Sequence, residues 1–294
     1  MLGRLDLDFV QQSAHELLGA FLFRLAQHLA GRPALHHHAA VHEHHFVGRL
    51  PGKGELVRDD HHGPALVGQF LDDGQDVVHQ FLIGNWDRSL ELANSIIAAE
   101  QTHYLSANAY QMRAYIGLAR GDGRALADSE KAVEYARRIG DAQALGPTLS
   151  GHIRLLAIEG DRLTARTLLE EVIDFFTANP TAPYTWAPPF VWAFASVGEP
   201  GEYLALVERE APSPWSEAAL ATCAGDFVAA AEIYARIGDV SDAAQARVLA
   251  AEVLLERGDR LGSAQQLAHA IAFYRSVGAT RLIQDAERLL AATA

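Results

Sequence analysis

The fold is decided by GDRLTARTLLEEVIDFF, residues 160–176, and by GDRLGSAQQLAHAIAFY, residues 258–274. Both stretches open with Gly-Asp and continue with apolar residues at spacings of three and four. This periodicity is typical of an amphipathic helix. Glycine adopts the left-handed conformation that ends one helix, and aspartate caps the beginning of the next. Each stretch therefore predicts a tight turn that joins the two helices of a pair.

Similar glycine-centred turns recur along the chain at intervals of 37, 39, 38, 27 and 33 residues. An interval of this length accommodates one helix, a turn, a second helix and a connection. The six turn glycines are Gly84, Gly121, Gly160, Gly198, Gly225 and Gly258. From Gly84 onward the chain is also rich in Ala, Leu, Glu and Arg, which favour helix. The sequence therefore predicts an all-α domain built from repeated helix pairs over residues 84–294.

Two positions after the turn glycine keep the same character from one unit to the next. The fifth residue is small in four of the six units, where two helices must approach closely, and the twelfth is apolar in at least five. The small residues are Ser89, Ala165, Ala230 and Ser263, and the apolar ones are Ile96, Val133, Val172, Ile237 and Ala270. We expect both sets to be buried between helices.

This pattern resembles the tetratricopeptide repeat, in which the second helix carries a small residue, a large one four positions later and a further small or apolar one. Two units follow it, with Ala230, Tyr234 and Ile237 in one and Ser263, Leu267 and Ala270 in the other. The unit at 122–139 departs from it, because Leu126 and Glu130 stand where small and apolar residues are expected. The resemblance implies a right-handed α-solenoid of about five helix pairs, closed by a final helix within 280–294.

The closing stretch AIAFYRSVGATRLIQDAERLLAATA, residues 270–294, resembles the C-terminal end of the helical region in large bacterial signalling ATPases. Those proteins are linked to nucleotide-cyclase or DNA-binding domains and carry their chemistry upstream of this region. The resemblance therefore implies a non-catalytic interaction scaffold from a signalling or transcriptional regulator, with no cofactor of its own.

In a solenoid of this type the first helices of successive units line a concave groove that receives a protein or peptide. We therefore expect the outward-facing positions of those helices to contact a partner. These positions are Gln111, Ser150, Arg154, Trp192, Trp215 and Glu252.

The repeat is interrupted at NPTAPYTWAPPFVWAFASVGEP, residues 179–200, which contains five prolines. Proline is tolerated in the first turn of a helix and excluded from its interior. We expect a loop to about residue 187 and a short helix that Pro188 and Pro189 open. The segment also holds a dense aromatic cluster of Tyr184, Trp186, Phe190, Trp192 and Phe194. These rings either replace the packing of a shortened helix or form a hot spot for a partner.

Charge and composition narrow the class of protein. The formal net charge of −13 disfavours binding to polyphosphate, so nucleic acid is not an expected partner. The sequence contains no apolar run long enough to predict a membrane helix. A single cysteine, Cys223, excludes an internal disulfide and suits a reducing compartment, so we expect a cytoplasmic protein.

Catalytic motifs are absent or incomplete. GRLPGKGE, beginning at Gly48, lacks both the spacing and the hydroxyl of a phosphate-binding loop. Cys223 lies in an Ala-rich helical segment and is expected to be a small core residue. We expect the carboxylates on the predicted helix faces to be solvated. These are Glu130, Glu134, Glu170, Glu171, Glu208 and Glu210.

Residues 1–83 differ in character, since they carry eleven of the fourteen histidines, six of them within ALHHHAAVHEHHFVG, residues 34–48. If this stretch were helical, His38, His42 and His45 would share one face and could bind zinc. Nearby glycines and prolines oppose such a rigid element. We therefore expect 1–83 to be poorly ordered with one helix near 10–30, and keep a His-rich metal-binding protein as the alternative.

The repeat array also begins abruptly, because GNWDRSLELANSII, residues 84–97, resembles a second helix whose first helix is not recognisable upstream. Runs such as DDHH are typical of a GC-rich gene read from the opposite strand. We therefore entertain the hypothesis that 1–83 is a non-native leader joined to a truncated array.

Overall fold

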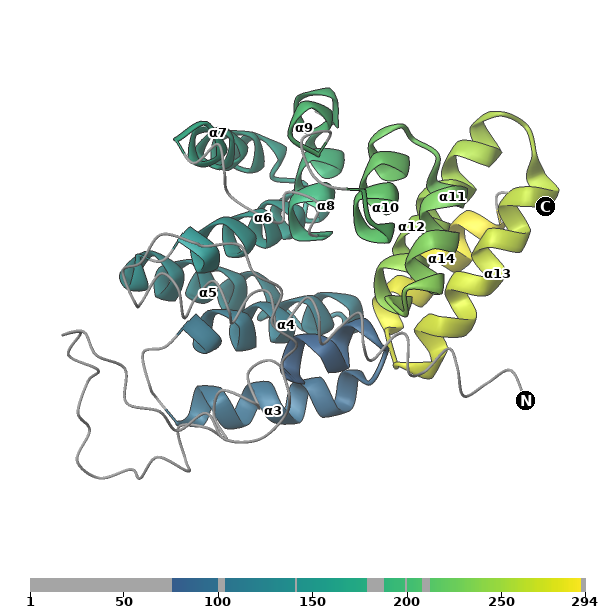
Figure 1. Cartoon of the computed structure of the whole chain (residues 1–294). Coiled ribbons are helices and arrows are strands. Elements are labelled where there is room, and N and C mark those ends of the chain that lie inside the picture. Colours follow the sequence, from purple (N-terminus) through teal and green to yellow (C-terminus); the bar gives the residue numbers. More distant parts are fainter. Residues whose placement is uncertain are drawn as a thin grey trace, which may run out of the picture. The chain divides into compact units, whose positions relative to one another are not determined.

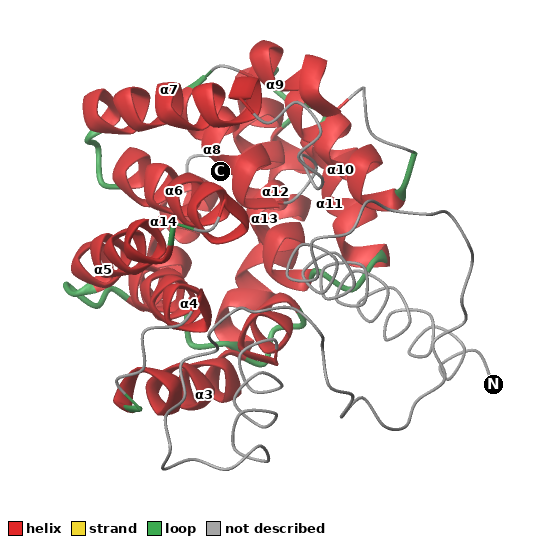
Figure 2. Cartoon of the chain, turned by 60° about the vertical axis from the view of Figure 1, so that its left-hand side comes forward, coloured by secondary structure: helices red, strands yellow, loops and turns green. Residues whose placement is uncertain are grey.

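The computed structural model describes residues 76–99, 104–140, 142–178, 188–198, 200–207 and 212–291. All regular structure in these ranges is helix, and none is strand (Figure 2). The all-α prediction is therefore confirmed for the described part of the chain. The chain divides into the units Met1–Gly68 and Gln69–Ala294. The helix expected near 10–30 and the His-rich stretch lie outside the described residues.

Short turns join α4 to α5, α6 to α7 and α12 to α13 (Figure 1). A helical segment at residues 76–82 precedes α3. The labelled helices are α3 (Trp86–Ala98), α4 (Tyr104–Arg120), α5 (Ala125–Ile139), α6 (Ala142–Ile158), α7 (Arg162–Ala178), α8 (Pro188–Val197), α9 (Pro200–Val207), α10 (Pro214–Cys223), α11 (Phe227–Arg236), α12 (Val240–Glu256), α13 (Arg260–Ser276) and α14 (Thr280–Ala291). The final helix predicted within 280–294 is therefore present as α14.

The turns have the predicted backbone chemistry. All six turn glycines have a positive φ, for example 92° at Gly160 and 81° at Gly258. Residues other than glycine rarely adopt this backbone conformation. The glycines therefore mark the points where helices end. The Asp259 carboxylate accepts a hydrogen bond from the Gly262 backbone N–H at 2.9 Å and thereby caps α13. Asp161 and Asp226 cap α7 and α11 in the same way.

The fifth and twelfth positions after the turn glycines are buried as expected. The fifth residues Ser89, Ala165, Ala230 and Ser263 are fully buried, and the twelfth residues Ile96, Val133, Val172, Ile237 and Ala270 are buried as well. The two serines also make equivalent hydrogen bonds. The Ser89 hydroxyl donates to the Val77 carbonyl and the Ser263 hydroxyl to the Ala251 carbonyl, each at 2.8 Å and twelve residues back. The same contact therefore joins the two helices of the first and the last described pairs.

The bond from Ser89 to Val77 also identifies the helix that precedes α3. Val77 and Phe81 of the segment 76–82 are buried in the same core as Trp86, and the rings of Phe81 and Trp86 stack at 5.3 Å. The first helix of this pair, which the sequence pattern did not reveal, is thus at least partly formed by residues 76–82. The described helices therefore begin before the boundary expected at Gly84.

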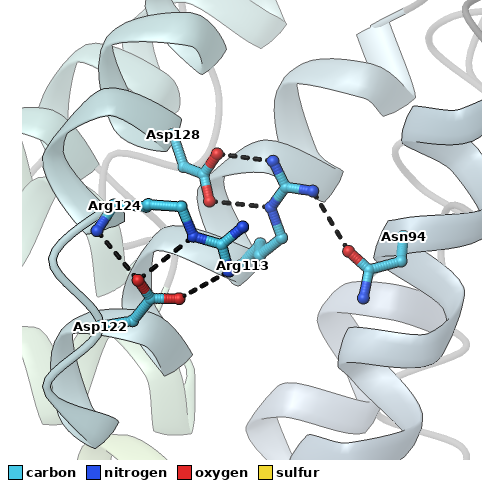
Figure 3. A network of polar contacts seen from close by, with 5 residues as sticks. All are labelled: Asn94, Arg113, Asp122, Arg124 and Asp128. Atoms are coloured by element: carbon cyan, nitrogen blue, oxygen red, sulfur yellow. Dashed lines mark hydrogen bonds and ion pairs between the residues drawn. The ribbon is translucent and has the colours of Figure 1, made fainter.

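Neighbouring pairs are joined through their first helices, because α6 contacts both α4 and α8, and α8 contacts α10. Hydrogen bonds between polar side chains also connect neighbouring helices. Arg113 of α4 donates to Asp128 of α5 through two nitrogen atoms and to Asn94 of α3 (Figure 3). Arg124 bonds to the nearby Asp122 in the turn before α5. One guanidinium therefore holds three successive helices.

The two ends of the helical unit are in direct contact. The Trp86 indole N–H of α3 donates to the Ser241 hydroxyl of α12 at 3.0 Å. The Arg120 guanidinium at the end of α4 donates to the Val277 carbonyl at 2.7 Å, and α14 packs against α4. Arg281 of α14 forms an ion pair with Glu159 at the end of α6. The last helices therefore close against the first ones instead of extending away from them.

The proline-rich interruption produces the predicted short helix, since α8 begins at Pro188. Phe190, Trp192 and Phe194 are buried, with Phe190 against Phe176 and Phe194 against Tyr203 at ring distances of 4.9 Å. These three rings fill the interior, which agrees with the packing interpretation. Tyr184 and Trp186 lie outside the described residues.

Candidate functional site

Four of the six predicted groove residues come together on the inner helices, where Gln111, Ser150 and Trp192 are buried and do not face outward as expected. Ser150 and Arg154 are one turn apart on α6 and share a face. The Arg154 guanidinium lies over the Trp192 ring of α8, with the guanidinium carbon 5.6 Å from the ring centre. A Cβ atom on Gly151 would lie 2.6 Å from the Gln111 Nε2 atom, so the Gln111 amide of α4 ends against the backbone of α6.

Arg154 is the centre of this group and connects it with α12. Its guanidinium donates to the Gln245 Oε1 atom at 2.7 Å and lies 3.6 Å from the Asp242 Oδ1 atom. It also lies over the Tyr115 ring of α4 at 5.1 Å. The side chains of Arg154 and Asp242 are 12% and 4% exposed. Removal of one partner from such a buried pair would leave an uncompensated charge.

We call this group the inner polar cluster. It comprises Gln111, Tyr115, Ser150, Arg154, Trp192, Asp239, Asp242 and Gln245. Asp239 belongs to it because its carboxylate caps α12, accepts from the Asp242 backbone N–H at 3.0 Å and faces the Asp242 carboxylate. The cluster thus joins α4, α6 and α8 to the beginning of α12.

Two buried polar atoms of the cluster, Ser150 Oγ and Trp192 Nε1, have no hydrogen-bond partner within the described structure. The Tyr115 hydroxyl lies within hydrogen-bonding reach of Gln111 and Arg154, and the Asp239 carboxyl lies within reach of the Asp242 carboxyl, which also pairs with Arg154. The large majority of buried side-chain polar atoms in proteins are hydrogen-bonded. The unpaired Ser150 and Trp192 atoms therefore need a partner from outside the chain, such as water or a ligand.

Burial shifts the acid–base behaviour of the cluster. The pKa of Asp239 lies well above its ordinary value because the carboxyl is buried and faces the Asp242 carboxylate. Burial also raises the pKa of Tyr115 to about 12, which Arg154 partly opposes. Tyr115 is thus neutral at neutral pH, and Asp239 favours its protonated form.

The remaining two predicted residues lie apart from the cluster. Trp215 of α10 is half-buried and packs against the core group that contains Trp192. Glu252 of α12 is exposed. It follows Gln245 by seven residues and therefore lies on the same side of α12, about 10 Å further along the axis. Of the six predicted groove residues, four therefore form a largely buried group, whereas Trp215 and Glu252 are more accessible.

Sequence reasoning missed Asp239, Asp242 and Gln245. The available signal was a further Gly-Asp turn at Gly238 and Asp239, which resembles the other turns but was not among the six. Two polar residues in the Ala-rich α12, Asp242 and Gln245, are three positions apart and hence on one face. Periodicity alone does not distinguish this inward polar face from a solvated one.

Cys223 is buried, as expected for a small core residue, and burial raises the pKa of its thiol to about 12. The thiol is therefore protonated at neutral pH. Glu130, Glu134 and Glu170 are exposed and Glu171 is half-buried, while Glu208 and Glu210 lie outside the described residues.

The described ranges bring no three His, Cys, Asp or Glu side chains together as metal ligands would be. His38, His42 and His45, the residues of the metal-binding alternative, lie outside these ranges. No helix in the described part combines the length and the apolar character needed to cross a bilayer. The chain matches no protein-family model and no curated protein sequence.

Proposed function

We propose that this chain is a non-catalytic interaction scaffold, a TPR-like right-handed solenoid whose first helices bind a protein or peptide. One observation carries the proposal: Gln111, Ser150, Arg154 and Trp192 were predicted to face a partner, and they meet on three different helices. These side chains are largely buried, and Arg154 also bonds to α12. The unpaired Ser150 hydroxyl and Trp192 indole N–H among them supply hydrogen-bonding capacity that the chain itself does not use.

The partner would reach this face from its accessible edge. Glu252 is exposed and Trp215 half-buried, while Arg154 at the centre keeps a small exposed fraction. Aromatic and arginine side chains of this kind are enriched among interface hot spots. As the resemblance implies, the scaffold would serve a cytoplasmic bacterial signalling or transcriptional regulator and would need no cofactor.

Photo-cross-linking of the full chain to a bound peptide tests this function. Peptides would be selected from a random library by binding to the full chain. A photoreactive residue would then replace Glu252 on the first-helix side of its pair, or Glu232, which is exposed on α11, as the matched control. We expect cross-links from position 252 and none from position 232. Equal cross-linking at both positions, or failure to select any peptide, would contradict the proposal.

A further inference from the structure

The inner face, formed by the sides of α4, α6 and α8 that carry the inner polar cluster, is covered by α12 of the same chain. Five of the six residues 241–246 are buried. Six consecutive residues extend more than once around a helix, so the first turns of α12 are enclosed on every side. Trp192 of α8 packs in one apolar cluster with Ala243 and Ala246. Thus α12 occupies the place that an array of helical repeats leaves open for a partner.

Polar contacts to α12 join residues that are far apart in the sequence. The Trp86 indole N–H donates to the Ser241 hydroxyl across 155 residues, and the Arg154 guanidinium donates to Gln245 across 91 residues. The Ser241 hydroxyl in turn donates to the Phe81 carbonyl at 2.6 Å. We call these contacts, together with those of α13 and α14 to the first helices, the seam.

The seam also completes the apolar core of the first helices. Ala270, Tyr274 and Val277, which lie in α13 or directly after it, are buried in the same cluster as Leu105 and Ile116 of α4. Burial of apolar surface is the dominant favourable term in association as well as in folding. The two ends of the helical unit therefore stabilise each other, and each would expose apolar surface without the other.

The chain passes from one side of the seam to the other through short helices. Helices α8, α9 and α10 are 10, 8 and 10 residues long, and each begins with a proline. Proline interrupts a preceding helix, so the three stay separate. The seam contacts would be the same between two copies, because their partners are so distant in the sequence. Exchange of identical elements between copies is a characteristic alternative assembly of repeat proteins.

We propose that the inner face binds a second copy of this chain through exchange of α10–α14, so that α12 of each copy fills the inner face of the other. Asp242 and Gln245 of one copy would then meet Arg154 of the other. The exchanged dimer has two equivalent seams. The proposal goes beyond the scaffold function and does not depend on a peptide, so failure to select a peptide would leave it unaffected.

The first test is the molar mass of the full chain, measured by size-exclusion chromatography with light scattering. A single chain presents its own α12 to the inner face at an effective concentration of about millimolar, so exchange competes with closure within one chain. We expect a species of twice 31.9 kDa, whose fraction increases when the chain is refolded at about 1 μM, about 30 μM and about 1 mM. A mass of 31.9 kDa at all three concentrations would overturn the proposal.

A cross-linking test distinguishes the exchanged dimer from any other. Glu159 of α6 and Arg281 of α14 form an ion pair across the seam, and their side chains are 31% and 33% exposed. Two differently tagged chains, Glu159→Cys and Arg281→Cys, would be co-produced and treated with a short bismaleimide. The native Cys223 should not react, because it is buried and its thiol has a pKa raised to about 12. We expect a cross-linked product that carries both tags.

Two controls make the outcome decisive. The double variant Glu159→Cys, Arg281→Cys should cross-link within the monomer, which shows that the reagent spans the gap. In the matched control, Ser95→Cys on the exposed face of α3 replaces Arg281→Cys and should give no product with both tags. A dimer without the product of positions 159 and 281, or an equal yield from the Ser95→Cys pair, would overturn the proposal.

Discussion

The Arg154 guanidinium of α6 donates to the Gln245 side chain of α12, 91 residues further along the chain, at 2.7 Å. Together with the Asp242 ion pair, this contact joins helices that lie three pairs apart in the sequence. It occurs on the side of α6 that was expected to face an open groove. The inner face of the helical unit is therefore a bridged and largely buried surface, with its polar atoms turned inward.

Loss of Arg154 should destabilise the fold strongly. Arg154→Met leaves the Asp242 carboxylate buried without a counter-charge, and we expect a loss of about 3–5 kcal/mol in the free energy of unfolding. The double variant Arg154→Met, Asp242→Asn should recover part of this loss, with a coupling of about 1–3 kcal/mol. Urea denaturation measures both quantities.

The matched control for Arg154 is Arg137→Met. Arg137 forms an ion pair with Glu171 at the surface, where the two side chains are 50% and 42% exposed. Such surface pairs contribute about 1 kcal/mol or less. Equal losses in Arg137→Met and Arg154→Met would show that the bridge to α12 has no special role.

Asp239 should make the protein less stable as the pH rises. Its pKa is higher in the folded state than in the unfolded chain, where it is about 3.9. The folded state therefore retains the proton as the pH rises above that value, and its stability falls by up to about 1.4 kcal/mol per pH unit until the raised folded pKa is reached. Asp239→Asn keeps an oxygen that can cap α12 and removes this proton. Its unfolding free energy should lose that slope, and an unchanged slope would refute the assignment.

His152 should produce the opposite dependence. The ring is buried, with Nδ1 2.9 Å from the Ser129 hydroxyl, and burial lowers its pKa in spite of the nearby Glu130. Because the unfolded chain binds the proton more readily, stability is retained above about pH 6.5 and falls as the pH decreases through the lowered folded pKa. His152→Gln should flatten the stability curve in the range just below about pH 6.5. A curve identical to that of the wild type would contradict this role.

The repeated serine contact should contribute equally at both ends of the unit. Ser89→Ala and Ser263→Ala each delete one buried hydrogen bond to the paired helix, and alanine fits because Ala165 and Ala230 occupy the equivalent positions. We expect losses of about 0.5–1.5 kcal/mol in each case. Ser276→Ala, whose hydroxyl bonds within its own exposed helix end, should cost less. A clear difference between the two buried serines would show that the pairs are not equivalent.

The features that were predictable are those that one helix pair determines by itself. Turn glycines, capping aspartates and small residues at close approaches act over fewer than about forty residues, and these predictions are confirmed. The contact of Trp86 with Ser241 depends on how small rotations between successive pairs accumulate, which no local pattern encodes. Asp242 lies inside the helical unit for the same reason, because its position depends on how the later helices pack against the earlier ones. The sequence did not predict Val77 and Phe81 as core residues, because their helix lies within a His-rich region without a clear apolar periodicity.

The most direct test of the inner face as the binding face is hydrogen–deuterium exchange of the full chain with and without a selected peptide. The account predicts added protection in α4, α6, α8 and α12, whose side chains form the inner polar cluster. The second helices α5, α7 and α13 should exchange as before. Protection confined to α5, α7 and α13 would contradict the account.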